Sequence, residues 1–310
     1  MKRVLVTGAA GFIGGHLCHR LIESGISEVI GVDNLRSGDW ERTPPEVQKY
    51  EKDINEIEAA EWADLLEGVD VVFHLAAEKY NSSRSTPEKL LDTNVFATER
   101  LMRAGAIAGV RRMVFTSSLY AYGSMGPNVM TEQDVAQPST LYGASKLMGE
   151  GIARSIDREI GLSWNVARLF FIYGPKQHAD GGYKSVILSN FERVLRGERP
   201  TIYGDGLQGL DYVYIEDCVN ALVLLATSET DRKVVNVSTG SPVSVKELTA
   251  LMSGVSSSRF EAVYLDPDWT HQSQRYGSNT LIESLFGWRP QRSTEEGLRS
   301  VFDWLNGELL

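Results

Sequence analysis

The sequence predicts an α/β protein built on a doubly wound parallel sheet, followed by a smaller mixed α/β region. Two observations carry this prediction. Short apolar, β-branched runs alternate with helix-length stretches through the first half of the chain, and the first run ends in a glycine-rich turn that leads into a helix. Such runs are typical of parallel strands covered on both faces, and repeated βα units place helices on both sides of the sheet.

The first half of the chain supplies the repeated βα units. The expected strands are RVLVT at 3–7, EVIGVD at 28–33, VDVVFH at 69–74, RMVFTS at 112–117 and WNVAR at 164–168. Amphipathic stretches between and after them predict helices near 12–24, 57–67, 88–108 and 141–160. A helix-length segment between successive strands is what a parallel sheet requires.

Beyond Pro175 the pattern is less regular. Helices are expected near 184–196, 215–227, 244–253, 279–288 and 293–306, and a strand at 234–237. The glycine pair Gly181 and Gly182 and the run YGDG at 203–206 interrupt these elements. We expect this part to pack over the carboxyl edge of the sheet, where ligands of doubly wound folds bind.

The composition excludes several classes of protein. The 310 residues include 41 Asp and Glu against 31 Lys and Arg, which gives a formal net charge of -10. Because a field of this sign repels polyanions, we expect neither a nucleic acid nor an anionic membrane as a partner. Cys18 and Cys218 are too few for a disulfide scaffold or a structural zinc site, and no apolar run reaches the length of a membrane span. We therefore expect a cytoplasmic protein without a metal.

The turn after the first expected strand has the spacing of a dinucleotide-binding loop. Gly8, Gly11 and Gly14 allow a tight turn, close approach of the backbone to a pyrophosphate, and packing of the next helix, whose N-terminus attracts anions. Asp33 ends the second expected strand, 19 residues after Gly14, where it can bind the adenosine ribose. The sequence therefore predicts a Rossmann-type domain that binds NAD rather than NADP. We interpret Arg36 as a solvated loop residue.

A second group of residues indicates acid/base chemistry. Tyr142 and Lys146 have the i, i+4 spacing that places both side chains on one face of the expected helix. A tyrosine titrates near ~10, so we expect the Lys146 ammonium to lower the pKa of Tyr142 toward the working range. Ser118 lies at the end of the fourth expected strand, where its hydroxyl can share a substrate oxygen with Tyr142.

These motifs occur together in one known family. The chain carries the glycine loop at 8–14, HLAA at 74–77, Ser118, the Tyr142 and Lys146 pair, RLFFIYGP at 168–175 and IYGDG at 202–206. In this order they resemble the extended short-chain dehydrogenase/reductases, specifically the NAD-dependent nucleotide-sugar epimerase/dehydratase family. Within it, the pattern is similar to that of the UDP-glucose 4-epimerases.

The resemblance implies roles for individual residues. Tyr142 would be the acid/base, Lys146 its partner and a ligand of the nicotinamide ribose, and Ser118 a hydrogen-bonding partner of the reacting hydroxyl. The other cofactor-binding residues that it implies are Gly8, Gly11, Phe12, Ile13, Gly14, Asp33, Asn34, Asp53, Ile54, Leu75, Ala76, Ala77, Lys79, Asn94 and Ser117. On the substrate side it implies Lys79, Phe171, Thr201, Tyr203 and Arg275, with Arg275 near a phosphate. His74 is interpreted as a packing residue.

Two positions depart from the family pattern at the expected diphosphate site. Phe171 stands where relatives commonly have an asparagine, and Leu210 stands where they have an arginine. Charge-assisted contacts of this kind are worth about 1.5–3 kcal/mol each, so the diphosphate must be held in another way. Candidate replacements besides Arg275 are Lys176, Lys184 and His178.

The residues after Ser118 indicate which reaction to expect. Dehydratases of the family carry an Asp-Glu pair there to expel a hydroxyl, whereas this chain has Leu119 and Tyr120. Without that pair, the simplest chemistry is oxidation and re-reduction at one carbon. This reaction epimerises a nucleotide-diphosphate sugar. We expect the epimerised carbon to be C4 of a UDP-hexose. The alternatives are a dehydrogenase, ketoreductase or dehydratase of the same family, and a non-catalytic NAD-binding protein.

The resemblance also implies an arrangement of domains and subunits. We expect an NAD-binding domain at 1–173, with segments near 211–238 packing back onto it, and a substrate-binding domain at 174–310. Relatives commonly pair through the helices that correspond to 88–108 and 141–160, so a homodimer is expected.

Overall fold

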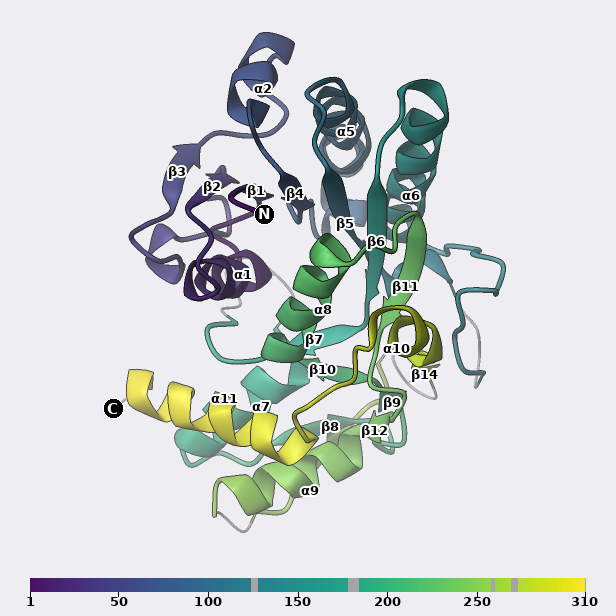
Figure 1. The fold of residues 1–310 in the computed structure, drawn as a ribbon. Coiled ribbons are helices and arrows are strands. Elements are labelled where there is room, and N and C mark those ends of the chain that lie inside the picture. The colour runs from purple at the N-terminus through teal and green to yellow at the C-terminus, as the bar shows by residue number, and fades with distance from the viewer. Residues whose placement is uncertain (124–127, 178–183, 258–259, 269–272, 310) are drawn as a thin grey trace.

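A parallel sheet forms the centre of the computed structural model, which describes residues 1–310 except 124–127, 178–183, 258–259, 269–272 and 310 (Figure 1). Within the described residues the sheet has seven strands in the order β11-β6-β5-β4-β1-β2-β3, all parallel to their neighbours. They are β1 (Arg3–Thr7), β2 (Glu28–Asp33), β3 (Gln48–Glu51), β4 (Val71–His74), β5 (Arg112–Ser118), β6 (Trp164–Leu169) and β11 (Lys233–Val237). The predicted doubly wound sheet is confirmed.

Helices cover both faces of the sheet. Figure 1 shows α2 (Ala59–Leu66), α5 (Thr98–Ile107) and α6 (Leu141–Ile160) along one side, and α1 (Phe12–Glu23) and α8 (Ile215–Thr227) along the other. Alternate residues of each strand enter the two cores: Val4 and Val6 pack with α1 and α8, whereas Leu5 packs with α2, α5 and α6. This alternation explains why strands buried on both faces read as continuous apolar runs.

Two elements of the first half differ from the sequence prediction. β3 was not expected, because an edge strand that pairs with β2 alone needs no apolar run, and its residues are mostly exposed. The helix expected at 88–108 is divided into α4 (Pro87–Leu91), a π-helical turn η2 (Asp92–Ala97) and α5. Nothing in the hydrophobic period distinguishes a π-turn from continuous α-helix.

The rest of the chain forms small sheets and helices beyond the carboxyl ends of the strands. The small sheets pair β7 (Phe171–Tyr173) with β10 (Tyr212–Tyr214), β8 (Thr201–Tyr203) with β13 (Val263–Leu265), and β9 (Gly209–Leu210) with β12 (Val243–Ser244) and β14 (Gln274–Arg275). The helices are α7 (Val186–Leu195), α9 (Val245–Val255), α10 (Thr280–Phe286) and α11 (Thr294–Leu309), while short α3 (Ser82–Ser85), η1 (Trp40–Arg42) and η3 (Leu119–Ala121) lie in loops of the first half. Gly181 and Gly182 lie outside the described residues.

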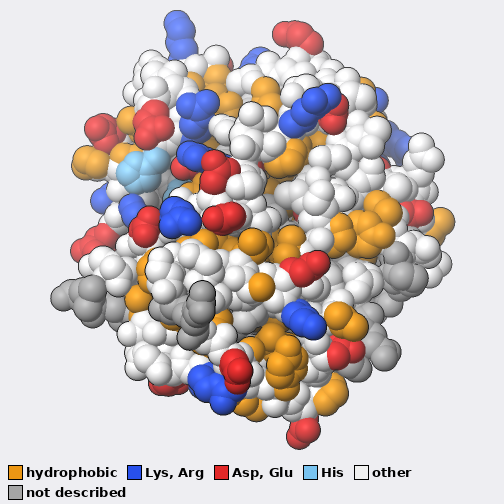
Figure 2. All heavy atoms as spheres, turned by 90° about the horizontal axis from the view of Figure 1, so that it is seen from below, with side chains coloured by type: hydrophobic (Ala, Val, Ile, Leu, Met, Phe, Trp, Pro, Cys, Tyr) orange, Lys and Arg blue, Asp and Glu red, His pale blue; other side chains and the backbone are white. Residues whose placement is uncertain are grey.

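The surface mixes both signs of charge with apolar side chains. On the face that Figure 2 shows, acidic and basic side chains are interspersed instead of gathering into a patch of one sign. Among the helices in the described part of the chain, none combines the length and apolar character needed to cross a membrane.

Candidate active site

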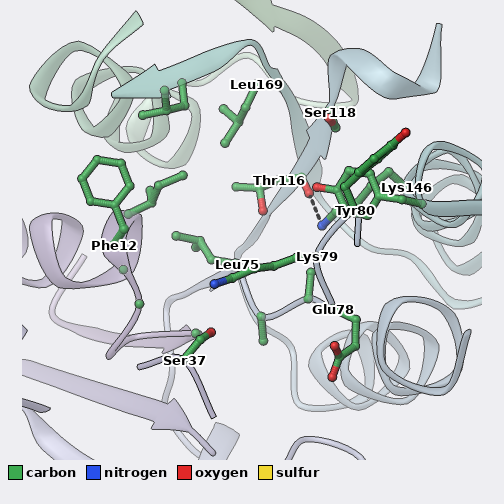
Figure 3. A pocket seen from close by; sticks show the side chains of 18 of the residues that line it. Phe12, Ser37, Leu75, Glu78, Lys79, Tyr80, Thr116, Ser118, Lys146 and Leu169 are labelled. Atoms are coloured by element: carbon green, nitrogen blue, oxygen red, sulfur yellow. Dashed lines mark hydrogen bonds between the residues drawn. The ribbon is translucent and has the colours of Figure 1, made fainter. Parts of the chain in front are cut away.

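A cavity of about 780 Å³ runs along the carboxyl edge of the sheet. One end is lined by the turns after β1, β2 and β4, and the other by the segment after β6, the start of α7 and the strands β9, β10 and β14. Figure 3 shows its wall between the Phe12 region and the Tyr80 and Lys146 region. The elements that meet here are far apart in the sequence, and the parallel topology brings them to one edge.

The glycine turn allows a ligand to approach its backbone closely. Gly8 has a left-handed φ of +72°, and a Cβ on it would lie 2.8 Å from the backbone N of Ala76. A Cβ on Gly14 would lie 2.0 Å from the carbonyl oxygen of Gly8. The N-cap of α1 is Gly11, which has no side chain to cap the first N–H groups of the helix. These N–H groups therefore remain available to an anion, as a pyrophosphate site requires.

Asp33 is fixed at the end of β2. Its carboxylate accepts hydrogen bonds from the N–H groups of Ala10 (3.0 Å) and Leu35 (2.9 Å). Burial raises the pKa of this carboxyl, while the two N–H donors act in the opposite direction. Because each carboxylate oxygen has two lone pairs, Asp33 can still accept from ribose hydroxyls in the cavity that it lines.

Arg36 is more than the solvated loop residue that the sequence suggests. It is half-exposed, but its guanidinium lies 3.3 Å from the Asp53 carboxylate and 3.5 Å from that of Glu78. Glu78 is also paired with Lys89 at 2.7 Å. The Arg36 charge is therefore paired with carboxylates on two other loops, although Arg36 also lines the cavity. The selection of NAD over NADP by Asp33 stays a prediction.

Tyr142, Ser118 and Lys146 meet at the middle of the cavity. The Ser118 side chain lies near enough to the Tyr142 phenol to lower its pKa. The Lys146 ammonium donates to the carbonyl oxygen of Thr116 at 2.9 Å (Figure 3) and lies 5.9 Å from the centre of the Tyr142 ring. All three side chains line the cavity, so the spacing prediction on α6 is reproduced.

The predicted lowering of the Tyr142 pKa is not what the structure shows. Burial raises the pKa of Tyr142 to about 12, and the nearby Ser118 side chain opposes this only in part. Burial also lowers the pKa of Lys146 to about 7. The protein alone therefore disfavours both the phenolate and the ammonium, because the enclosure that excludes water removes the solvation of both charges.

The other predicted cofactor residues divide into two groups. Phe12, Ile13, Asn34, Ile54, Leu75, Ala76, Ala77, Lys79 and Ser117 line the cavity, and Figure 3 shows Lys79 extending into it beside Leu75. Asp53 and Asn94 do not line it but hold residues that do. Asp53 accepts from the Asn34 amide at 2.9 Å, and Asn94 accepts from the N–H of Glu78 at 2.7 Å and donates to Ser145 at 3.0 Å.

His74 has the packing role predicted for it. It is fully buried between the hydroxyls of Thr7 (2.7 Å) and Thr98 (2.9 Å). Burial lowers its pKa to about 3, so the imidazole stays neutral. It joins β1, β4 and α5 behind the cavity.

The substrate end of the cavity is mainly apolar. It is lined by Leu169, Phe170, Phe171, Ile172, Tyr173, Val186, Ile187, Leu210 and Tyr212. Arg275 supplies a cation, and its guanidinium lies 5.3 Å from the centre of the Tyr120 ring. Lys184 is paired with Glu192 on α7, Lys176 is not among the lining residues, and His178 lies outside the described residues.

Thr201 and Tyr203 are not brought to this cavity. Both belong to the described β8 but not to the set of lining residues. The N–H of Thr201 donates to Asn190 at 2.9 Å, and the side chain of Tyr203 is 44% exposed. Their predicted contact with a nucleotide base stays a prediction.

Sequence reasoning missed an aromatic cluster beside Tyr142. The Tyr80 and Tyr120 rings lie 5.0 Å apart, and each meets the Tyr142 ring nearly edge-on, at 6.5 Å and 5.9 Å. Tyr80 follows Lys79 directly, and Tyr120 lies two residues after Ser118. The position of both tyrosines next to predicted site residues could have indicated that they belong to the site.

Comparison with known proteins agrees with this geometry. The profile of the family described as "NAD dependent epimerase/dehydratase family" matches residues 4–238. The chain belongs to this family. Its members include a UDP-glucose 4-epimerase of Mycolicibacterium smegmatis, 31% identical over 315 residues that cover 99% of each chain. NAD is accordingly the cofactor, and the glycine turn, the uncapped start of α1 and Asp33 fit it.

Solved structures of the family superpose over the whole chain. The UDP-glucose 4-epimerase of Thermotoga maritima, solved with UDP-glucose, is 33% identical, with a TM-score of 0.92 over 99% of this chain and 100% of that one. MoeE5, solved with UDP-glucuronic acid and NAD, is 34% identical, with a TM-score of 0.86 over 99% of each chain.

Proposed function

We propose that this family member epimerises a UDP-hexose at C4, by oxidation to the 4-keto sugar and return of the hydride to the opposite face. The observation that carries the proposal is the meeting of the Tyr142 and Ser118 hydroxyls with Lys146 inside a dinucleotide cavity. Leu119 and Tyr120 follow Ser118, so this turn presents no carboxylate to expel a hydroxyl. The relatives named UDP-glucose 4-epimerase support the same reaction.

The roles of the side chains follow from their positions. Tyr142 takes the proton from the sugar hydroxyl and later returns it, while Ser118 holds the same oxygen. Lys146, fixed by the Thr116 carbonyl, supplies positive charge close to the phenol and binds the nicotinamide ribose. NAD, when bound, accepts the hydride and gives it back, and its oxidised ring adds a positive charge that favours the phenolate.

Different residues along the cavity bind the cofactor and the sugar nucleotide. The cofactor is bound by Gly8, Gly11, Phe12, Ile13, Gly14, Asp33, Asn34, Ile54, Leu75, Ala76, Ala77, Lys79 and Ser117, supported by Asp53 and Asn94. The sugar nucleotide is bound by Lys79, Phe171 and Arg275. Thr201 and Tyr203 lie outside this lining, so their contact with the nucleotide base stays a prediction. In this division residues 1–173 with 211–238 form the cofactor domain, which also contributes Lys79 and Phe171 to the substrate, and the remainder of 174–310 forms the substrate domain.

An apolar surface on α5 and α6 suits a second copy of the chain. Phe96 on η2, Ile107 on α5, and Met148 and Ile160 on α6 are exposed, and α5 and α6 pack side by side (Figure 1). Exposed large apolar side chains on neighbouring helices are a feature of contact surfaces. We infer a homodimer in the cytoplasm, and expect sedimentation to give the mass of two chains for the wild type and of one for Ile107→Glu. A wild-type chain that sediments as a monomer would contradict this inference.

The test of the activity is direct. The purified protein is incubated with UDP-glucose without added NAD, and the sugar is followed by NMR. UDP-galactose is expected, because the cofactor is regenerated in each cycle. A reaction that requires stoichiometric NAD would indicate a dehydrogenase, and no product under any cofactor condition would refute the proposal.

A further inference from the structure

A buried ion pair lies behind the candidate active site. Glu150 on α6 is completely buried, and Arg168 on β6 is 4% exposed. The guanidinium donates through Nε (2.9 Å) and Nη2 (2.8 Å) to the two oxygens of the carboxylate. This fork-to-fork contact fixes both the distance and the orientation of the two side chains.

The pair is connected to the strand that ends in the site. The Ser117 hydroxyl donates to Glu150 at 2.6 Å, and Ser117 directly precedes Ser118. The Arg168 guanidinium also lies over the Tyr122 ring, 4.4 Å from its centre. Through these contacts α6, β5 and β6 are held together at the level where β5 ends.

The spacing along α6 relates the pair to the acid/base residues. Tyr142, Lys146 and Glu150 are separated by four residues each, so they follow one another along one face of the helix. Glu150 therefore holds the same helix face that presents Tyr142. Any rotation or slide of α6 against β5 would change the separation of the Tyr142 and Ser118 hydroxyls.

Stability alone does not account for such a pair. Desolvation of two buried charges commonly cancels their attraction, and apolar residues of similar volume often serve equally well or better. Apolar residues cannot reproduce the fixed distance and orientation that a bidentate contact imposes on its two elements.

We propose that Glu150 and Arg168 are positioning residues for the reaction, which set the register of α6 on β5 so that the Tyr142 and Ser118 hydroxyls reach the same substrate oxygen. This inference rests on the proposed function for its kinetic consequence. The geometric consequence, the separation of the two hydroxyls, can be measured without any substrate.

The test removes the pair without leaving a buried charge. Glu150→Met/Arg168→Met is expected to fold with a Tm close to that of the wild type. Its kcat for UDP-glucose should fall by about 10- to 100-fold, because small misplacements of reacting groups have effects of this size, while KM stays unchanged. Rates are compared at equal NAD content, because the cofactor-lining Ser117 loses its Glu150 partner. Arg168→Lys, which keeps the charge but loses the fork, should also lower kcat at unchanged KM.

A matched control separates positioning from general damage. Arg112 is a buried arginine at the start of β5, the strand that ends in Ser118, and it donates to the carbonyls of Leu225, Ser228 and Thr230. Arg112→Met is expected to lower the Tm but to leave the kcat of the folded enzyme unchanged.

A crystal structure of the double variant supplies the readout that needs no activity. Compared with the wild-type structure, we expect the Tyr142 and Ser118 hydroxyls to lie farther apart in it. An unchanged separation of the hydroxyls, or a double variant or Arg168→Lys with wild-type kcat, would overturn the proposal. If the wild type does not convert UDP-glucose, the proposed function fails, and the hydroxyl separation alone decides this inference.

Discussion

The contribution of Lys146 to the reactivity of Tyr142 can be worked out from the structure. The ammonium lies 5.9 Å from the centre of the Tyr142 ring. At an effective dielectric constant of about 20, a unit charge at this distance favours the phenolate by about 3 kcal/mol, or about two pKa units. Lys146→Met should therefore lower kcat about 100-fold at neutral pH.

The Lys146→Met substitution should also change how kcat depends on pH. Burial places the pKa of Tyr142 at about 12 and that of Lys146 at about 7, and phenolate formation would raise the lysine value, so the two groups titrate as a coupled pair. Without the lysine, the phenolate fraction grows about tenfold per pH unit as long as the pH stays below the phenol pKa. The kcat of Lys146→Met should thus rise steeply with pH, whereas the wild type should depend on it less.

The assay is the initial rate of UDP-galactose formation between about pH 6 and 9, measured on wild type and variant with equal NAD content. Cofactor content must be measured because Lys146 also faces the ribose. A Lys146→Met enzyme within threefold of wild-type kcat, with the same pH profile, would refute the electrostatic role.

Three further substitutions have definite expected outcomes. Tyr142→Phe keeps the ring contacts with Tyr80 and Tyr120 and should lower kcat by about 10²- to 10⁴-fold with Tm and NAD content unchanged; more than a tenth of wild-type activity would remove Tyr142 as the base. Gly14→Ala should abolish cofactor retention, since its Cβ would lie 2.0 Å from a carbonyl oxygen, whereas Gly254→Ala, with open space at its Cβ, should bind NAD normally. Phe171→Asn should lower the KM for UDP-glucose by up to about tenfold, because the asparagine can add one net hydrogen bond to the diphosphate. An unchanged KM would place the diphosphate elsewhere.

The sequence was sufficient for the parts of the fold that depend on local patterns. The apolar strands, the glycine turn and the i, i+4 pair on α6 all appear where expected, because each is specified by neighbouring residues. β3 and the π-turn η2 escaped prediction because an exposed edge strand has no apolar run, and a single π-turn of six residues is too short to be recognised in the hydrophobic pattern.

The site was less predictable where it depends on distant segments. Sequence spacing put Lys146 beside Tyr142, but only the folded chain shows that burial raises the pKa of the phenol and lowers that of the amine. The Arg275 guanidinium over Tyr120 and the Glu150 and Arg168 pair join residues from separate strands and helices. No local pattern contains such contacts.

The central claim is that a hydride leaves C4 of the sugar and returns to the same carbon without leaving the enzyme. The most direct measurement follows UDP-glucose deuterated at C4 by NMR and mass spectrometry, with no added cofactor. The account predicts UDP-galactose that retains the deuterium at C4. Loss of the label to solvent, or its transfer to another carbon, would contradict the claim.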